Sequence, residues 1–323
     1  MTERSWVDGV EGAEVPIDDR GFNLADGAFE TMRVKAGLPA CFSLHRARLA
    51  AGLSCLGFDS PAKTAEKALL DALEWLRAID WEASGVLRLT LTRGSGPRGY
   101  RALSGLPTRL VSRFVPGEIQ PPLAPARMGI APICYASQPF FHGAKLLARA
   151  EQVVATSWAH QQGYDDALMS SAEGRWVSAG SGNLFLRLGT RLMTPPVDDM
   201  GIAGTRRELI LSTLATSAGY EVAVEPCTEE IARGADEAFL CNAVVGIRSI
   251  QSVADIGFAS TAAAERLRPL VAVRACSAFR AGLTRSFDTR RRSRPGGRQI
   301  HGARASGLPV RLRVFGSRRI RRA

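Results

Sequence analysis

The sequence predicts an α+β protein, because segments of helical periodicity and meanders of short strands follow one another without a regular βαβ succession. Residues 45–57 place leucines at helical spacing, and residues 62–79 form a longer amphipathic stretch. Residues 85–93 instead alternate leucines with polar side chains, which is typical of a half-buried strand. The chain has 323 residues, of which 46% are hydrophobic and 23% charged, so a disordered chain is excluded and one or two globular domains are expected.

The remaining elements follow in chain order. Gly57 stands where the first helix would be capped. Four prolines within residues 116–127 predict an extended linker and a domain boundary. Beyond it we expect a strand at 128–135, a helix at about 146–161, a meander over 166–192 and a helix that ends near 218.

The positive charge of the chain lies at its C-terminal end. The net charge is +11, but residues 271–323 hold fifteen arginines, no lysine and one acid, Asp288, which gives this stretch +14 and leaves −3 for the rest. The tail, residues 273–323, has no sustained periodicity, and we expect it to be solvated and disordered, with weak salt-dependent binding to polyanions. An RNA-binding arm and a translated wrong reading frame are alternatives.

The cysteines and the chain's first residues indicate a cytoplasmic protein. The six cysteines form no CxxC motif and no pattern with the four histidines, so reduced thiols are expected and a metal site is not. The first residues carry mixed charge and lead into no apolar stretch, and no window has the length of a membrane helix.

Lys145 is the candidate for covalent chemistry. It follows an aromatic loop, Pro139 to Ala144, and precedes an apolar run that predicts the start of a helix. Desolvation and the positive end of a helix dipole both disfavour an ammonium group, and a neutral amine can form a Schiff base. The alternative is a surface lysine whose stem lies along apolar groups.

A phosphate site is the second candidate. Residues 201–205 contain two glycines before a predicted helix, and backbone N–H groups at a helix N-terminus can hold an anion. Arg48, on the first helix, would supply a guanidinium to the same phosphate. The alternatives are an ordinary glycine-rich helix start and one arginine among many.

Together these features resemble the fold-type IV pyridoxal-phosphate enzymes, and most narrowly the 4-amino-4-deoxychorismate lyases. The resemblance covers roughly residues 5–270, and the narrower assignment comes from the turn Arg93-Gly-Ser-Gly-Pro-Arg-Gly-Tyr100. The other matching stretches are Asp19 to Thr31, Leu44 to Leu49, Lys145-Leu-Leu-Ala-Arg-Ala-Glu-Gln152, Asn183-Leu-Phe185, Thr194 to Gly204 and Asp236 to Asn242.

The resemblance implies a fold, a cofactor and a set of site residues. The fold would have a small N-terminal α/β domain (1–115), a larger cofactor-binding domain (128–272) and usually a second copy in a homodimer. Lys145 would bind pyridoxal phosphate covalently. Arg48 and the amides of Ile202, Ala203, Gly204 and Thr205 would hold its phosphate, and Arg93, Arg98 and Asn242 would lie at the substrate end.

One position departs from the family pattern. The family has an acid, normally glutamate, five residues before the asparagine of the Asn-Leu-Phe stretch, where it keeps the pyridine nitrogen protonated. Counting back from Asn183 gives Ser178, and a one-residue gap gives Ala179. A serine cannot stabilise positive charge as a carboxylate does, so we expect weaker electron withdrawal by the ring. Glu173 is expected at a turn, at the wrong end of the strand.

The function that follows is the conversion of 4-amino-4-deoxychorismate to p-aminobenzoate and pyruvate, a step of folate biosynthesis, impaired by Ser178. Two arginines suit a dicarboxylate substrate. The alternatives are a branched-chain or D-amino-acid aminotransferase of the same fold, and a catalytically silent relative whose basic tail binds nucleic acid.

Overall fold

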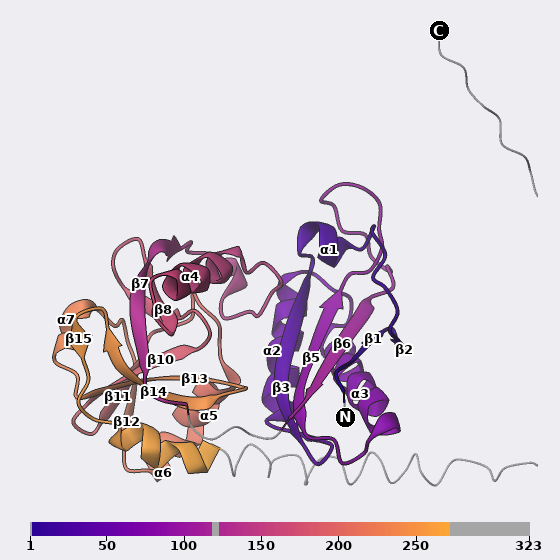
Figure 1. The fold of residues 1–323 in the computed structure, drawn as a ribbon. Helices are drawn as coiled ribbons and strands as arrows, with labels where there is room; N and C mark the ends of the chain where they lie inside the picture. Colours follow the sequence, from indigo (N-terminus) through magenta and orange to yellow (C-terminus); the bar gives the residue numbers. More distant parts are fainter. Residues whose placement is uncertain (1, 118–122, 272–323) are drawn as a thin grey trace, which may run out of the picture. The chain divides into compact units, whose positions relative to one another are not determined.

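The computed structural model describes residues 2–117 and 123–271, and these belong to one compact unit (Figure 1). The predicted α+β class is confirmed, since the unit contains helices and two mainly antiparallel sheets. The arginine-rich tail, including Cys276, and part of the expected linker lie outside the described residues.

The first sheet is antiparallel throughout and has the order β2-β1-β6-β5-β3-β4. Two helices, α2 and α3, pack their apolar faces on its inner leucines and close the first core. Gly57 follows the C-cap of α2 with a φ of +68°, as the sequence indicates. The elements are β1 (Arg4–Val7), β2 (Val10–Glu11), α1 (Arg20–Leu24), β3 (Gly27–Lys35), β4 (Leu38–Pro39), α2 (Phe42–Cys55), α3 (Pro61–Ile79), β5 (Gly85–Thr92) and β6 (Arg109–Pro116).

The second sheet has the order β12-β11-β10-β13-β14-β7-β8-β9, with β15 paired to β14. The pairs β7–β8, β7–β14 and β11–β12 are parallel, and the expected meander over 166–192 forms the antiparallel hairpins β8–β9 and β10–β11. Its strands are β7 (Ala126–Tyr135), β8 (Asp166–Ser171), β9 (Trp176–Ala179), β10 (Asn183–Leu188), β11 (Arg191–Thr194), β12 (Glu221–Val224), β13 (Glu237–Asn242), β14 (Gly246–Val253) and β15 (Ile256–Gly257).

The helices of this second part confirm one prediction and correct another. The helical run expected to end near 218 begins at Thr205 and includes one π-helical segment. The helix expected from 146 begins only at Ala150. The helices are η1 (Pro139–Phe141), α4 (Ala150–Gln161), α5 (Thr205–Leu209), η2 (Ile210–Leu214), α6 (Ala215–Ser217) and α7 (Glu229–Arg233), and residues 262–271 are also helical.

The late start of α4 has a clear cause. Leu146 forms an antiparallel bridge with Ala28, and the Leu147 N–H donates to the Gly27 carbonyl at 3.1 Å. The backbone around Lys145 therefore pairs with the start of strand β3 and cannot be helical. The apolar residues that predicted a helix at 146 and 147 instead meet this strand.

The two sheets use residues 4–116 and 126–257, so β6 and β7 reach into the ends of the expected linker, while the proposed domain limits themselves stay a prediction. Cys55, Cys134, Cys227 and Cys241 are free thiols. Within residues 2–117 and 123–271, no helix combines the length and apolarity needed to cross a membrane.

Candidate active site

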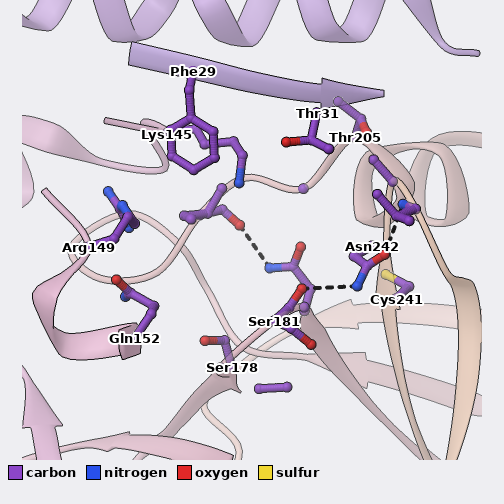
Figure 2. A pocket seen from close by; sticks show the side chains of 18 of the residues that line it. Phe29, Thr31, Lys145, Arg149, Gln152, Ser178, Ser181, Thr205, Cys241 and Asn242 are labelled. Atoms are coloured by element: carbon purple, nitrogen blue, oxygen red, sulfur yellow. Dashed lines mark hydrogen bonds between the residues drawn. The ribbon is translucent and has the colours of Figure 1, made fainter. Parts of the chain in front are cut away.

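A pocket of about 330 Å³ is lined by residues of both sheets and contains Lys145 (Figure 2). On one side lie the side chains of β3, β5 and α2, and on the other the ends of β9 and β13 and the segments after them. The lining includes basic, aromatic and small polar side chains: Phe29, Thr31, Arg48, Arg88, Tyr135, Lys145, Arg149, Gln152, Ser178, Asn183, Thr205 and Asn242.

Lys145 is held at the pocket by its own backbone. The Phe29 N–H donates to the Lys145 carbonyl at 3.1 Å, and the Lys145 ammonium nitrogen lies 4.2 Å from the centre of the Phe29 ring. Figure 2 shows the side chain directed into the pocket. The alternative of a surface lysine, with its stem along apolar groups, is therefore wrong.

The amine of Lys145 is easily deprotonated. Burial lowers its pKa from 10.5 to about 7, and the positive charge of Arg48 adds to this effect, while Glu30 opposes it. The sequence predicted the direction correctly through desolvation. The second cause, a helix N-terminus at Lys145, is wrong, because α4 begins five residues later.

Arg48 is fixed by a buried carboxylate that the sequence analysis did not select. Glu30 accepts from Arg48 Nε at 2.8 Å and from Nη2 at 2.6 Å, and Arg48 Nη1 donates to the Ala203 carbonyl at 3.0 Å. A guanidinium has five N–H groups, so at most two remain for an anion in the pocket. Arg48 therefore reaches the pocket already oriented.

His45 completes this buried cluster. Its Nδ1 lies 2.6 Å from Glu30 Oε2, and both side chains are fully buried. Burial alone raises the pKa of Glu30, but the neighbouring Arg48 and His45 lower it to about 2. Burial also lowers the pKa of His45. The cluster is thus a carboxylate shared by an arginine and a histidine.

Residues 201–205 form the predicted turn before α5. Gly204 is the N-cap, and Thr205 Oγ1 is buried in the pocket without a hydrogen-bond partner among the described residues. The first N–H groups of a helix have no intrahelical acceptor, so Gly204 and Thr205 present donors here. Ala203 is different, since its N–H already donates to the Gly143 carbonyl at 2.9 Å. Its predicted contribution through the amide is therefore wrong.

Ser178 lines the pocket from β9, as the sequence predicts, and only 5% of it is exposed. Its hydroxyl lies 3.1 Å from the hydroxyl of Tyr135, which accepts a hydrogen bond from Gln152 Nε2 at 2.9 Å. Glu173 lies in the turn before β9, is exposed, and does not line the pocket.

The structure does not bring the three predicted substrate residues together. Asn242 lines the pocket, and its side-chain oxygen accepts from the Val244 and Val245 N–H groups. Arg93 instead pairs with Asp26 at 2.8 Å and stacks over Phe58, in a separate hollow.

Arg98 is exposed and does not line the pocket of its own chain. Its role, and that of Arg93, at a substrate site therefore stays a prediction.

Two other arginines line the pocket. Arg88 lies opposite Thr31 in the β3–β5 pair, so both side chains share the face of the sheet that meets the pocket. Its guanidinium carbon lies 4.1 Å from the Phe29 ring centre. Arg149 donates through Nε to the Leu146 carbonyl at 2.9 Å. In the part of the chain that the structure describes, neither forms an ion pair with a carboxylate.

Comparison with known proteins gives matches over most of the chain. Residues 27–253 match the family described as amino-transferase class IV. Aminodeoxychorismate lyase of Vibrio harveyi is 28% identical over 266 residues, which is 77% of this chain and 90% of that protein. D-alanine aminotransferase of Bacillus licheniformis is 25% identical over 240 residues, which is 74% and 83% of the two chains.

Solved structures show the same fold. The crystal structure of 4-amino-4-deoxychorismate lyase from Pseudomonas aeruginosa matches with a TM-score of 0.72 and 28% identity, covering 88% of this chain and 99% of that one. Two more distant aminotransferase structures, with TM-scores of 0.75 and 0.71, contain bound pyridoxal phosphate.

The residues of the pocket fit pyridoxal phosphate. Lys145 offers an amine whose pKa is close to neutrality. Arg48 and the unpartnered Thr205 hydroxyl lie beside a helix start, where a phosphate would satisfy them. The three groups lie around one pocket, so a single molecule with an aldehyde and a phosphate can contact all of them.

Proposed function

Because this chain belongs to the class IV aminotransferase family of pyridoxal-phosphate enzymes, we propose that it is a lyase that forms p-aminobenzoate and pyruvate from 4-amino-4-deoxychorismate. The observation that supports this proposal most is the charge of the pocket. After Arg48 is assigned to the phosphate, Arg88 and Arg149 remain without carboxylate partners in the described chain. A substrate with two carboxylates matches this surplus.

The relatives favour the same substrate. Aminodeoxychorismate lyases are found both among the related sequences and among the solved structures, at 28% identity and with 90% or more of the relative covered. The motif around Arg93 to Tyr100 supports the narrower assignment. Folate biosynthesis is the pathway that consumes p-aminobenzoate, and the proposal places the enzyme, as a homodimer, in the cytoplasm.

Five residues of the pocket have distinct tasks in this proposal. When bound, pyridoxal phosphate would supply an electron-withdrawing ring. The Lys145 amine would remove a proton from the substrate ring and protonate the departing enolpyruvate, because its pKa lies near neutrality. Arg48 and Thr205 hold the phosphate, and Arg88 and Arg149 orient the two carboxylates.

Ser178 would limit the rate. Elimination also aromatises the substrate ring, so product formation supplies part of the driving force that a weaker electron sink lacks. We therefore expect a slow lyase. In the variant Ser178→Glu the rate of p-aminobenzoate formation should rise, and an unchanged rate would argue against this explanation.

The decisive assay measures p-aminobenzoate and pyruvate after the protein, loaded with pyridoxal phosphate, is mixed with aminodeoxychorismate. Wild-type protein should form both products in equal amounts, and Lys145→Ala should form neither. Absence of product from the loaded wild-type protein would contradict the proposed reaction.

An amino-acid aminotransferase is the second candidate, because D-alanine aminotransferases also match along 74% to 75% of the chain. Incubation with D-alanine or a branched-chain amino acid and 2-oxoglutarate separates the two candidates. Formation of glutamate without p-aminobenzoate activity would favour the aminotransferase.

A further inference from the structure

Three side chains at the floor of the pocket form a hydrogen-bonded row. Gln152 of α4 donates through Nε2 to the hydroxyl of Tyr135 at the end of β7, at 2.9 Å. The Tyr135 hydroxyl lies 3.1 Å from the hydroxyl of Ser178 on β9. All three line the pocket, and Ser178 is the member of the row that Figure 2 shows on the far side from Lys145.

One arrangement of protons in this row leaves a donor free for the pocket. The Tyr135 oxygen accepts from Gln152, and either hydroxyl can donate in the contact between Tyr135 and Ser178. When Tyr135 is the donor, Ser178 accepts from it and keeps its own proton for a further acceptor. Its side chain is buried, so in the loaded protein that acceptor must come from the pocket.

Among the described residues no carboxylate lines the pocket, and Asp166, behind the lining residue Ser181, already accepts from the Ser181 N–H and hydroxyl. The charged residues in the described lining are all basic: Arg48, Arg88, Lys145 and Arg149. Glu30, the carboxylate behind Arg48, is already shared with His45. Nearby positive charges disfavour the protonated form of a base.

The shape of the cofactor directs its ring nitrogen toward Ser178. In pyridoxal phosphate the pyridine nitrogen lies opposite the carbon that carries the aldehyde, and the phosphate arm is attached beside that carbon. With the aldehyde carbon toward Lys145 and the phosphate beside Thr205, the ring nitrogen would face the opposite side of the pocket, where Ser178 lies (Figure 2). The Ser178 hydroxyl can donate a hydrogen bond there.

We propose that Ser178 donates a hydrogen bond to the pyridine nitrogen of the cofactor, and that the nitrogen is held unprotonated by this donor and by the arginine-rich pocket. The inference rests on the cofactor site of the proposed function and is independent of the substrate. Tyr135 and Gln152 are positioning residues, because they act through Ser178 by fixing the direction of its proton.

A neutral nitrogen withdraws electrons from the substrate carbon less than a pyridinium does. Reactions that depend on the ring as electron sink, such as transamination, are then disfavoured relative to an elimination that gains an aromatic product. The chain would thus select its reaction through the charge state of the cofactor as well as through substrate contacts.

The test is ¹⁵N nuclear magnetic resonance of the protein loaded with pyridoxal phosphate labelled at the ring nitrogen. The wild-type signal is expected in the range of a hydrogen-bonded neutral pyridine, without change between about pH 6 and pH 9. In Ser178→Ala the signal should move downfield, because the hydrogen bond is lost. In Ser178→Glu it should move far upfield, toward the pyridinium range.

A wild-type signal in the pyridinium range would overturn the proposal, whatever the variants do. A signal that is unchanged in Ser178→Ala would overturn the assignment of Ser178 as the donor. Tyr135→Phe, which removes the proton that orients Ser178, should give a smaller downfield shift, and an unchanged signal would remove Tyr135 from the row. The spectrum needs no turnover, so a failed lyase assay would not change the conclusion about the ring nitrogen. An unexpected spectrum would likewise not change the conclusion about the lyase reaction.

Discussion

Glu30 and Arg48 form a two-point ion pair, in which the carboxylate accepts from Nε at 2.8 Å and from Nη2 at 2.6 Å. Glu30 lies on β3 and Arg48 on α2, so the pair joins the sheet and the helix that pack together in the first core. Because strand residues alternate between faces, Glu30 points toward α2 while its neighbours Phe29 and Thr31 line the pocket. This single strand therefore carries both the pocket wall and the support of the phosphate arginine.

The variant Glu30→Gln should weaken binding of pyridoxal phosphate by about tenfold to a hundredfold. Charge-assisted hydrogen bonds contribute about 1.5–3 kcal/mol, and an amide can accept only one of the two bonds from Arg48 without conflict. The measurement is the dissociation constant of pyridoxal phosphate, compared with that of pyridoxal, which has no phosphate and should bind nearly as before.

Glu225→Gln is the matched control, since Glu225 pairs with an arginine at the exposed surface and such pairs contribute little. An equal loss of affinity for pyridoxal and pyridoxal phosphate in Glu30→Gln would mean that the carboxylate supports the whole pocket and not the phosphate site.

The pH dependence of Schiff-base formation should reflect the environment of Lys145. In the folded, cofactor-free protein its amine is half neutral at about pH 7, whereas an ordinary lysine loses its proton near 10.5. The neutral amine is the nucleophile, so the rate of trapping by pyridoxal phosphate and cyanoborohydride should rise up to about pH 8 and then level off.

Nα-acetyl-lysine, treated in the same way, controls for the ionisation of the cofactor itself, and its rate should keep rising to pH 10. A trapping rate at Lys145 that follows the free amino acid across this range would contradict a lowered pKa. Peptide mapping identifies the modified residue.

The sequence selected those pocket-lining residues whose signals are local in the chain. Lys145, Arg48, Ile202, Gly204 and Thr205 each lie in a short motif, and Ser178 could be counted back from Asn183. Helical and alternating periodicity likewise located α2, α3 and β5, since each buries one face of a single segment.

What the sequence missed depends on pairing between distant segments. Glu30 becomes a partner of Arg48 only when β3 packs on α2, and Arg88 reaches the pocket only through its register with Thr31. Periodicity also placed the start of α4 too early, because nothing in residues 146–149 shows that their backbone pairs with β3.

Arg88→Gln should raise the KM for aminodeoxychorismate about tenfold or more and leave the affinity for pyridoxal phosphate unchanged. The guanidinium is assigned to a substrate carboxylate, and loss of one charge-assisted contact costs about 1.5–3 kcal/mol. Arg113→Gln is the control, because Arg113 is the cross-strand partner of Arg88 on β6 but already pairs with Glu3. If both variants raise KM equally, general electrostatics and not a direct contact explains the effect.

Gly204→Ala should weaken cofactor binding through the backbone alone. A Cβ at this position would lie 1.9 Å from Asn183 Oδ1, so either the helix start or Asn183 must move. Asn183 donates to the Ile202 carbonyl at 2.8 Å, and its displacement would also distort the turn that presents the N–H groups to the phosphate.

Overpacking of this kind costs about 1–3 kcal/mol, so the dissociation constant of pyridoxal phosphate should rise roughly five- to hundredfold. Gly257→Ala, where a Cβ meets nothing within 4 Å, is the matched control and should change neither binding nor Tm. Unchanged affinity in Gly204→Ala would show that the phosphate does not contact this turn.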